Sequence, residues 1–350
     1  MNRKYLWVIA SILMLSLLMA ACGRTPEAPK QNGPTETKKI SIGLLKLTSS
    51  APVFIGIEKG FFTEEGLNLD VQWFEAAHPI AVATASNKVD IGATGITASL
   101  YNMVTGGQKL SIVADKGREQ KGYSSSALLV ASDLWGQGIQ NIEQMKGKRI
   151  GITQTGSTYH YMIGRLLEAK GLSLTDVEIV PLGKMGALMA ALQSKQIDAV
   201  ILNEPNISAV LAAGYGKLVS QVGDVIDYQT SGIFFSPELM KDKVNAVRFL
   251  KGYIKASRYY YDAVLTQKDG KVVPGPNYDE VVGIIAKYTG APLKDVKTGL
   301  PYMDREGKLL TNDIQTQIDW YASHKMLEKS LNASLVTDTA LFEEALKQVK

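Results

Sequence analysis

The sequence predicts an α/β fold in which two lobes of similar design each carry a mostly parallel sheet. Segments with the period of strands alternate with segments that suit helices along most of the chain. Two strand-to-helix junctions are rich in hydroxyl side chains. Matching landmarks keep a constant spacing, since Gly43 and Gly151 are 108 positions apart, and so are Asp90 and Asp198. This internal repeat predicts two α/β modules that face each other across a cleft.

The junction at Ile150–Tyr161 carries the strongest local signal. Arg149–Thr153 alternates polar and apolar side chains as a strand does, and Gln154–Ser157 suits a tight turn. Ser157 or Thr158 is then expected to cap a helix. Such a turn aims backbone N–H groups, the positive end of a helix dipole and hydroxyls at one point, which suits an anion or a strongly polar small molecule. An ordinary capped turn has the same residues, so a purely structural junction remains the alternative.

A similar junction lies earlier in the chain. Ile40–Leu45 alternates as a strand, and the polar stretch Lys46–Pro52 follows it. Pro52 suits the first turn of a helix, and Ser49 or Ser50 is the expected cap. Both lobes are therefore expected to present a helix N-terminus and hydroxyl groups to the cleft.

The remaining elements and the lobe boundaries follow from the same patterns. The further expected strands are Leu67–Trp73, Asp90–Ala93, Leu110–Ala114, Glu178–Pro181 and Ile197–Leu202. The expected helices are Pro52–Gly60, Pro79–Asn87, Ile96–Thr105, Ser157–Lys170, Met185–Gln193, Pro205–Ala213, Pro237–Thr266, Asp279–Lys287, Thr311–His324 and Asp338–Val349. Crossings between the lobes are expected near Leu129–Asp133 and Ser231–Ser236. The first lobe then takes residues 39–130 and a mostly helical part at 232–350, and the second lobe takes 131–231.

The N-terminus resembles a bacterial lipoprotein signal. Positive charge at Asn2–Lys4 precedes the apolar run Tyr5–Met19, which is too short for a convincing membrane span. The run ends in small residues at Leu18–Cys22, similar to a lipobox, so residues 1–21 are expected to be removed and Cys22 to carry a lipid. The alternative is a generic secretory signal with an accidental cysteine. Residues 22–38, rich in Pro, Glu, Thr, Lys and Gly, predict a flexible tether.

Composition excludes several classes of function. The hydrophobic fraction of 45% supports real cores, and the net charge of +4 with no basic cluster argues against nucleic acid as a partner. The single cysteine forms no internal disulfide, and neither a metal-ligand cluster nor a Walker loop nor a Gly-x-Ser-x-Gly elbow occurs. No metal, no cofactor and no catalytic residue is therefore expected.

Five stretches resemble one known family. They are Ala51–Leu67 and Asp90–Gly95 in the first lobe, and Thr155–His160, Asp198–Ile201 and Asn203–Pro205 in the second. The family is the substrate-binding proteins of bacterial ABC importers for sulfonates, taurine, nitrate and thiamine-precursor pyrimidines. The resemblance covers nearly all of the mature chain. It implies a periplasmic-binding-protein-like fold of type II, with two lobes on a two-strand hinge, ligand trapped between them, and delivery to a membrane permease with its ATPase.

The matching positions supply most of the expected ligand-binding residues, and Phe74, His78 and Tyr123 are added because of their places in loops or before a helix. The full set is Thr48, Ser49, Ser50, Phe74, His78, Thr94, Gly95, Tyr123, Thr155, Gly156, Ser157, Thr158, Tyr159, Asn203 and Glu204. Each of the polar residues alone suits a turn or a cap as well as a ligand contact. Phe74, Tyr123 and Tyr159 offer aromatic faces to a planar ligand, although a core or rim position is the commoner role for such residues.

Several titratable residues bear on the chemistry of the ligand. His78 either faces the cleft or is a loop imidazole without a task, and His160 is expected to pack beside its helix. Lys116 and Arg118 offer counter-charge to an anion, although an exposed, solvated pair is more common. A carboxylate at Glu204 would repel a bare anion, so it slightly favours a ligand with N–H donors.

The ligand and the wider role stay open between alternatives. The hydroxyl-rich junctions favour a small organic anion such as an alkanesulfonate, taurine or nitrate, whereas the aromatics and Glu204 favour a pyrimidine or another planar heterocycle. A rival from another class is an enzyme that resembles the pyrimidine synthases of yeast, and a third is a ligand-sensing module. The preferred prediction is a monomeric, non-enzymatic binding component on the extracytoplasmic face of the cell membrane, lipid-anchored there.

Overall fold

The structure is a computed structural model that describes residues 37–269 and 271–349. The expected signal sequence, Cys22 and nearly all of the 22–38 tether lie outside the described residues. Thr37–Lys350 forms one compact unit, and both hydrophobic cores of the described part lie within it. This unit therefore has the buried apolar surface that it needs to fold on its own. Among the described helices, none combines the length and the apolar character that a membrane crossing requires.

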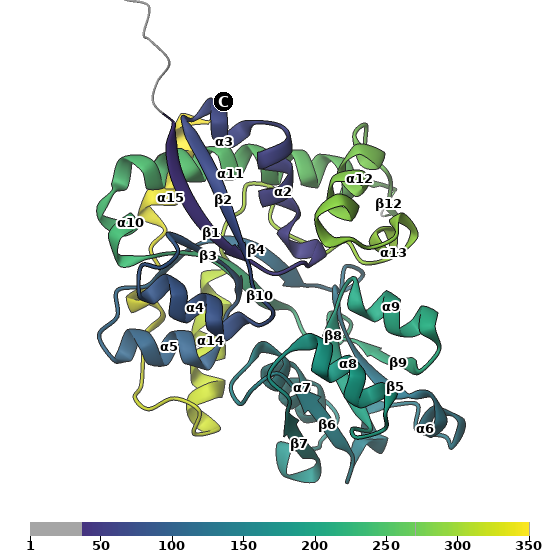
Figure 1. Cartoon of the computed structure of the whole chain (residues 1–350). Helices are drawn as coiled ribbons and strands as arrows, with labels where there is room; N and C mark the ends of the chain where they lie inside the picture. Colours follow the sequence, from purple (N-terminus) through teal and green to yellow (C-terminus); the bar gives the residue numbers. More distant parts are fainter. Residues whose placement is uncertain (1–36, 270, 350) are drawn as a thin grey trace, which may run out of the picture. The chain divides into compact units, whose positions relative to one another are not determined.

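Two five-stranded sheets form the framework (Figure 1). The first has the order β2-β1-β3-β10-β4, and the second has the order β7-β6-β8-β5-β9. One strand in each sheet, β10 or β5, is antiparallel to its neighbours, while the other pairs are parallel. The first sheet contains β1 Lys38–Leu44, β2 Leu67–Trp73, β3 Ile91–Gly95, β4 Ser111–Glu119 and β10 Tyr228–Phe235. The second contains β5 Ser126–Ala131, β6 Arg149–Ile152, β7 Glu178–Pro181, β8 Ala199–Asn203 and β9 Gly216–Gln221.

We call each sheet, together with the helices packed on it, the first or the second lobe. The first lobe has α2 Ala51–Glu58, α3 Phe61–Glu64, α4 Ala77–Ala85, α5 Ala98–Thr105, α10 Pro237–Lys241, α11 Lys243–Val264, α12 Tyr278–Thr289, α13 Leu293–Thr298, α14 Thr311–Ser323 and α15 Ala340–Gln348. The second has α6 Ser132–Gly136, α7 Thr158–Glu168, α8 Met185–Gln193 and α9 Asn206–Ala213. The remaining described elements are four short 3₁₀ turns and one hairpin. The turns are Thr48–Ser50, Ile142–Met145, Leu174–Asp176 and Ala333–Leu335, and the hairpin pairs β11 Gln267–Lys268 with β12 Lys271–Val272. This architecture confirms the predicted fold class.

Both faces of the first sheet are covered by helices. Ile40, Ile42 and Leu44 of β1 point into a core that includes residues of α2, α11, α12 and α15. The opposite face packs on α4, α5 and α14 in a second core, which continues into the second lobe. Figure 1 shows these two groups of helices on opposite sides of the sheet.

The internal repeat seen in the sequence corresponds to repeated local structure. The Asp90 carboxylate accepts a hydrogen bond from the Ser41 backbone N–H at 2.7 Å, and the Asp198 carboxylate accepts one from the Arg149 N–H at 2.8 Å. A Cβ on Gly43 would meet Ile80 of α4 at 3.1 Å, and one on Gly151 would meet Leu188 of α8 at 2.9 Å. In both lobes, therefore, an aspartate bonds the backbone of β1 or β6, and a glycine in the same strand lets α4 or α8 pack closely on it.

The crossings between the lobes lie earlier in the chain than the sequence predicted. The first falls between the end of β4 at Glu119 and the start of β5 at Ser126, and the second between β9 and β10, at residues 222–227. The predicted crossings at Leu129–Asp133 and Ser231–Ser236 fall in or at the ends of β5 and β10, strands whose residues are all buried. The apolar runs that seemed to be connections are antiparallel strands inserted in the sheets.

The two crossing segments contact each other and form a two-strand hinge. The Ser124 hydroxyl accepts a hydrogen bond from the Gly223 N–H at 3.0 Å. A Cβ on Gly223 would lie 2.6 Å from the Gln120 carbonyl oxygen, so the close approach requires a glycine there. The Glu119 carboxylate accepts hydrogen bonds from the hydroxyls of the three serines at positions 124–126, which ties the first crossing to β4.

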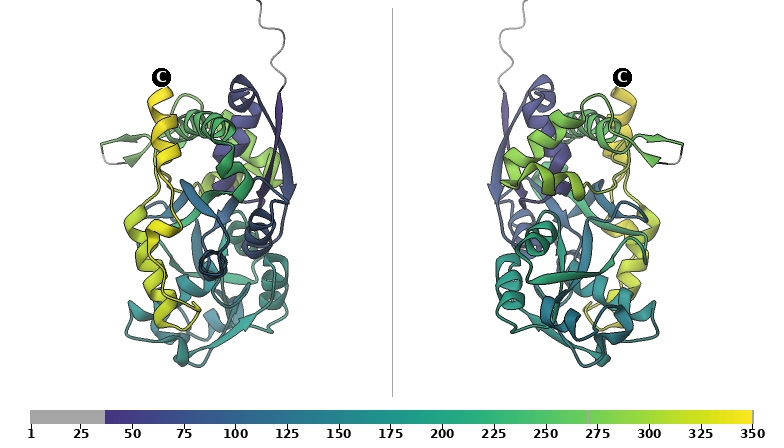
Figure 2. Two further views of the ribbon diagram at one scale, coloured as in Figure 1. Left: turned by 90° about the vertical axis from the view of Figure 1, so that its left-hand side faces the viewer. Right: turned by 90° about the vertical axis from the view of Figure 1, so that its right-hand side faces the viewer.

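The C-terminal segment of the chain also reaches both lobes. Figure 2 shows it in yellow along one side of the molecule, from α15 beside the first lobe to α14 beside the second. Trp320 of α14 donates its indole N–H to the Glu168 carboxylate of α7 at 2.7 Å. The same ring packs directly against Gly164 of α7, where a Cβ would lie 2.2 Å from it.

Candidate functional site

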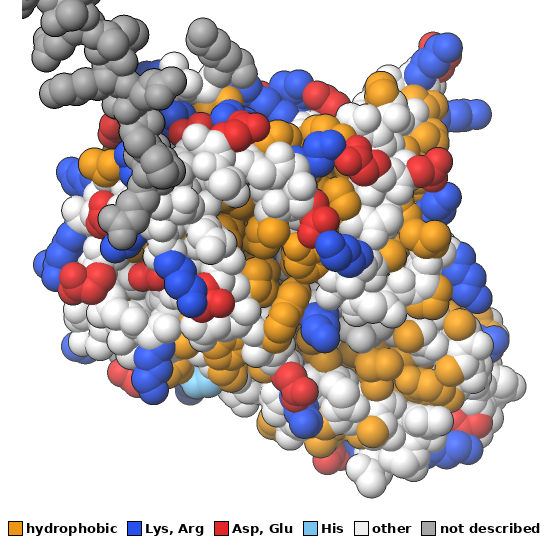
Figure 3. Space-filling model, turned by 45° about the horizontal axis from the view of Figure 1, so that its top comes forward, with side chains coloured by type: hydrophobic (Ala, Val, Ile, Leu, Met, Phe, Trp, Pro, Cys, Tyr) orange, Lys and Arg blue, Asp and Glu red, His pale blue; other side chains and the backbone are white. Residues whose placement is uncertain are grey.

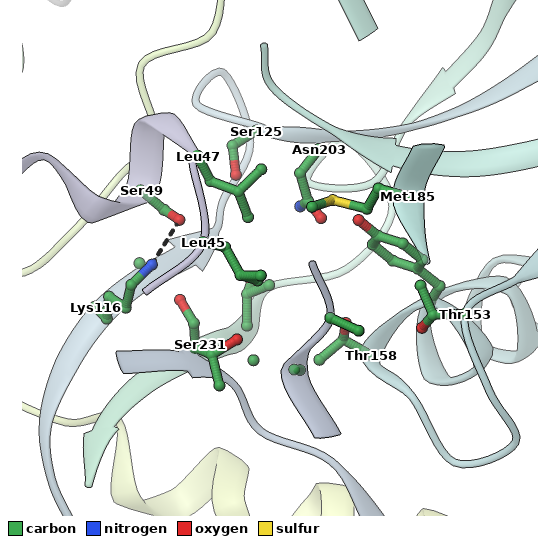
Figure 4. A pocket seen from close by; sticks show the side chains of 17 residues that line it. Leu45, Leu47, Ser49, Lys116, Ser125, Thr153, Thr158, Met185, Asn203 and Ser231 are labelled. Atoms are coloured by element: carbon green, nitrogen blue, oxygen red, sulfur yellow. Dashed lines mark hydrogen bonds between the residues drawn. The ribbon is translucent and has the colours of Figure 1, made fainter. Parts of the chain in front are cut away.

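A cavity lies between the lobes, at the carboxyl ends of the parallel strands, where open α/β sheets tend to bind ligands (Figure 4). Its walls come from the first lobe (Leu45, Leu47, Ser49, Ala76, Ala77, Thr94, Gly95, Lys116, Gly117, Thr230, Ser231) and from the first crossing and the second lobe (Ser125, Thr153, Thr158, Tyr159, Met185, Asn203). The cavity volume of about 40 Å³ is room for a few waters or for a small ionic head group.

Lys116 supplies the charge of this cavity. Its side chain is 1% exposed, and Nζ donates a hydrogen bond to Ser49 Oγ at 2.9 Å, as Figure 4 shows. Among residues 37–269 and 271–349, no carboxylate forms an ion pair with it. Burial lowers the pKa of Lys116 to about 7, against an opposing effect of Asp115. An ammonium has three N–H donors, so two remain for a group inside the cavity.

The neighbouring carboxylate of Asp115 binds other groups and forms no ion pair with Lys116. The Asp115 carboxylate accepts hydrogen bonds from the Gly117 N–H at 2.7 Å and the Asp304 N–H at 2.8 Å. It also pairs with the Arg118 guanidinium at 3.2 Å. Lys116 lies at a register shift of β4 against β10, between Asp115 and Gly117, and it forms no ion pair with Asp115. The cavity therefore holds a buried amine without a counter-ion in the part of the chain that the structure describes.

Polar groups of both lobes complete the wall of the cavity. Thr94 Oγ1 is buried and has no hydrogen-bond partner among the described residues. The Asn203 amide donates to Ser126 Oγ at 2.6 Å, and Ser126 in turn donates to the Glu119 carboxylate. This chain orients Asn203 toward the cavity from the second lobe. A buried hydroxyl without a partner costs free energy unless a ligand or water satisfies it.

The lobes meet directly beside the cavity. The Ala98 N–H of α5 donates to the Gly156 carbonyl at 2.9 Å. A Cβ on Gly95 would lie 2.6 Å from Thr158 Cγ2 across the gap. Ser157 Oγ accepts a hydrogen bond from the His160 N–H at 3.3 Å, so Ser157 is the N-cap of α7. The predicted junction is present, and its cap is the first of the two candidates.

The structure brings six of the fifteen predicted ligand residues together on the cavity wall. They are Ser49, Thr94, Gly95, Thr158, Tyr159 and Asn203. Their contact with a ligand stays a prediction. Two others lie directly behind the wall: Thr48 is buried with an unpartnered hydroxyl, and the Ser50 hydroxyl donates to the Leu45 carbonyl at 3.1 Å.

The other predicted residues lie off this wall. His78 Nδ1 is 3.0 Å from Ser99 Oγ, the Tyr123 ring packs on Tyr302, and Thr155 is exposed. Phe74 lines an adjoining groove, and Gly156 and Ser157 form the lobe contact and the helix cap described above.

The Glu204 carboxylate turns away from the cavity. It accepts hydrogen bonds from the Ser208 N–H and hydroxyl, both at 3.1 Å, at the start of α9. Gly299 packs on its side chain. The proposed repulsion of a bound anion by Glu204 therefore has no geometric basis.

His160 packs beside its helix, as the sequence suggested. Its Nδ1 accepts a hydrogen bond from the Gly156 N–H at 3.2 Å. Burial, with a smaller effect of His324, lowers the pKa of His160 to about 4, so the ring is neutral near pH 7. It supports the junction and carries no charge for a ligand.

Sequence reasoning missed Lys116 as the central residue because it expected the strand to end at Ala114. Residues 115–121 are mostly polar and suggested a loop. Pairing with β10 extends β4 to Glu119, with Gly232 beside Asp115 and Ser231 beside Gly117. The signal that would have found Lys116 is long-range pairing, which a local pattern does not contain.

Comparison with known proteins agrees with this architecture. The chain is 23% identical over 286 residues to a putative aliphatic sulfonates-binding protein of Escherichia coli, covering 81% of this chain and 78% of that protein. It is 23% identical over 259 residues to a nitrate/nitrite binding protein of Nostoc sp., covering 63% of this chain and 57% of that protein.

Solved structures share the fold. The alkanesulfonate-binding protein SsuA of Xanthomonas axonopodis pv. citri, bound to MOPS, superposes with a TM-score of 0.70 at 19% identity, covering 86% of this chain and 98% of that chain. The desulfurization enzyme DSZB superposes with a TM-score of 0.65 at 14% identity, covering 89% and 99%. The periplasmic-binding-protein fold thus serves both binding proteins and an enzyme. Residues 33–269 match the NMT1-like family, and the chain therefore belongs to that family.

Proposed function

We propose that the protein is the solute-binding component of an ABC importer and that its solute is a small anion. The observation that carries the proposal is Lys116, a buried amine in the interlobe cavity that has a single hydrogen-bond partner and no counter-ion among the described residues. An anion in the cavity would accept hydrogen bonds from the two remaining N–H groups of Lys116. Its negative charge would also favour the protonated form of the lysine. The relatives named for sulfonates and nitrate support the same class of ligand.

Closure of the two lobes would couple ligand binding to the conformation of the protein. The cavity wall takes Lys116 and Thr94 from the first lobe and Asn203 and Thr158 from the second. A ligand touches both walls only when the lobes are closed, so it shifts the population toward the closed state by its differential affinity. A permease that recognises the closed form would then receive the loaded protein.

A planar heterocycle with N–H donors fits less well, because the Glu204 carboxylate that favoured it faces Ser208.

The proposal also includes that the protein binds its ligand without catalysing a reaction, that it is monomeric, and that a lipid at Cys22 anchors it on the extracytoplasmic face. Figure 3 shows Lys and Arg interspersed with Asp and Glu on the face in view, without a field of one sign on that face. This pattern suits a free extracytoplasmic surface and offers no basic stripe for nucleic acid there.

The ligand half of the proposal is tested by calorimetry and thermal unfolding of Thr37–Lys350. Nitrate, methanesulfonate and acetate are compared with the uncharged dimethyl sulfone. At a hundredfold excess over its dissociation constant, a true ligand stabilises the fold by about 2.7 kcal/mol. Lys116→Met is expected to abolish the shift, and the exposed Lys88→Met is expected to keep it. Equal binding of dimethyl sulfone, or undiminished binding by Lys116→Met, contradicts an anion site.

The transport half is tested in cells. Uptake of the labelled anion is expected to stop when the gene is deleted, and normal uptake would favour a sensory role. Membrane fractions are expected to lose the protein when Cys22 is replaced by Ala. Retention of that variant in the membrane would contradict the lipid anchor.

A further inference from the structure

A second buried charge, the carboxylate of Glu119, lies beside the cavity at the end of β4. It accepts hydrogen bonds from the hydroxyls of Ser124, Ser125 and Ser126. In the part of the chain that the structure describes, no cation pairs with it. Burial raises the pKa of Glu119, and the three hydroxyls oppose this rise because they bond the ionised form.

The carboxylate determines which way the serine hydroxyls point their hydrogens. An ionised carboxylate only accepts hydrogen bonds, whereas a hydroxyl has one hydrogen to donate and two lone pairs. Ser125 and Ser126 both donate to the same oxygen of Glu119. Each therefore has only lone pairs left for its other neighbours. Because Ser125 lines the cavity, a group inside the cavity meets its oxygen as an acceptor.

The same direction of donation passes from Ser126 to Asn203 at the end of β8. The amide of Asn203 lies 2.6 Å from Ser126 Oγ, whose hydrogen is already given to Glu119. The atom of Asn203 that bonds Ser126 must therefore be the nitrogen, and this assigns the orientation of the amide. Among the described residues, no group donates to Asn203 Oδ1. Asn203 lines the cavity (Figure 4), so Oδ1 is a second acceptor there.

The cavity also contains groups of the opposite kind. Ser49 Oγ accepts its hydrogen bond from Lys116, so the Ser49 hydrogen and two N–H groups of Lys116 remain to be donated. The cavity wall thus carries donors at Lys116 and Ser49 and acceptors at Ser125 and Asn203. An anion that has no hydrogen to donate would satisfy the donors and leave the acceptors unpaired, which costs free energy in a buried site.

We propose that Glu119 is a positioning residue that sets the specificity of the cavity. It makes Ser125 and Asn203 acceptors, and so it selects an anion that also carries an O–H or N–H donor. Glu119 does not line the cavity and acts only through the hydroxyls of Ser125 and Ser126. The inference rests on the proposed anion site and adds the residue that imposes this second requirement on the ligand.

Calorimetric titration of Thr37–Lys350 with acetate and glycolate tests the requirement, because these carboxylates differ by one hydroxyl. Methanesulfonate and hydroxymethanesulfonate repeat the comparison with another head group. The wild-type protein is expected to bind each hydroxylated anion about fivefold more tightly than its partner, the effect of one neutral hydrogen bond. The ratio of the two affinities is the readout, since a merely structural role would change both affinities alike.

Variants of Glu119 separate its acceptor oxygen from its bulk. Glu119→Met removes the acceptor, so Ser126 can donate to Asn203 and reverse its amide, and the preference for glycolate is expected to disappear. Glu119→Gln keeps an acceptor oxygen for Ser125 and Ser126 and is expected to retain the preference.

Two serine variants test the same path without a change at Glu119. Ser126→Ala breaks only the link between Glu119 and Asn203, and it is expected to lower the ratio even if Glu119→Met fails to fold. Ser124→Ala is the matched control, because Ser124 bonds the other oxygen of the carboxylate and does not line the cavity. It is expected to keep the wild-type ratio.

Other outcomes overturn the inference. If the wild-type protein binds acetate and glycolate equally and both depend on Lys116, the proposed function stands and the role of Glu119 is refuted. A ratio that survives in Ser126→Ala and in every folded variant of Glu119 also refutes it. If none of the four anions binds, the proposed function and this inference both fail.

Discussion

Replacement of Lys116 by Met has a consequence for stability that follows from burial of the amine. Burial lowers the pKa of Lys116 from 10.5 to about 7. At about 1.4 kcal/mol for each pKa unit, the buried ammonium costs about 5 kcal/mol below pH 7. Methionine has a similar volume and no charge, and it loses only the hydrogen bond to Ser49, which is about 1 kcal/mol. Lys116→Met is therefore expected to be more stable than wild type by about 4 kcal/mol at about pH 6.

The lowered pKa of Lys116 determines whether the free energy of unfolding rises or falls with pH. Because the folded pKa is below the unfolded one, the unfolded wild-type chain binds more protons between about pH 7 and pH 10.5. Wild-type stability therefore rises with pH through this window, while Lys116→Met lacks this contribution. The advantage of the variant is expected to fall to about 1 kcal/mol near pH 9.

Urea unfolding of both proteins at about pH 6, 7.5 and 9, in buffers without small oxyanions, measures these differences. Other titrating groups are common to the two proteins and cancel to first order. Lys88→Met, which removes an exposed lysine, is the control and is expected to show no such trend. A variant that is less stable than wild type at pH 6, or a difference that is constant with pH, would refute the description of Lys116 as a buried amine without a counter-ion.

Two glycines test close approaches between elements, and a third tests open surroundings. Gly95→Ala places a Cβ 2.6 Å from Thr158 of the other lobe. It is expected to weaken anion binding at least tenfold in calorimetry with an unchanged melting temperature, and equal affinity would contradict lobe closure at this point. Gly164→Ala drives a Cβ to within 2.2 Å of Trp320 and is expected to cost about 1–3 kcal/mol in urea unfolding, against a helix-propensity gain of about 1 kcal/mol. Gly283→Ala in α12 meets nothing within 4 Å and is expected to stabilise by about 0.5–1 kcal/mol; destabilisation there would contradict the open surroundings.

Local patterns were enough to predict the two lobes and the junction at Ser157, whereas neither Ser49 nor Ser50 caps α2 with its side chain, because the Ser50 hydroxyl donates to the Leu45 carbonyl instead. The spacing of Asp90 and Asp198 reflects a real constraint, because each carboxylate bonds a backbone N–H of the neighbouring strand, β1 or β6. Ser157 was predictable as a cap because capping depends on residues within one helical turn. Features determined within a few residues of the chain are therefore visible in the sequence.

Features that depend on distant pairing were not visible. β10 enters the first sheet between β3 and β4, and this insertion makes Lys116 part of a buried strand. β9 and the antiparallel placement of β5 were missed for the same reason. Glu204 seemed to face the cleft because it follows a strand end, and only the structure shows that Ser208 captures it. Strand order is a property of the assembled sheet, so single-segment patterns do not contain it.

The two inserted strands explain why the interlobe cavity lies at the hinge. β5 starts beside the end of β8, with Ser126 opposite Asn203. β10 runs beside the end of β3, with Ser231 opposite Gly95. The crossings therefore emerge at the same edge as the carboxyl ends of the parallel strands, and Ser125 and Ser231 line the cavity. A ligand there contacts the chain where the lobes pivot, so that small changes in its contacts act directly on closure.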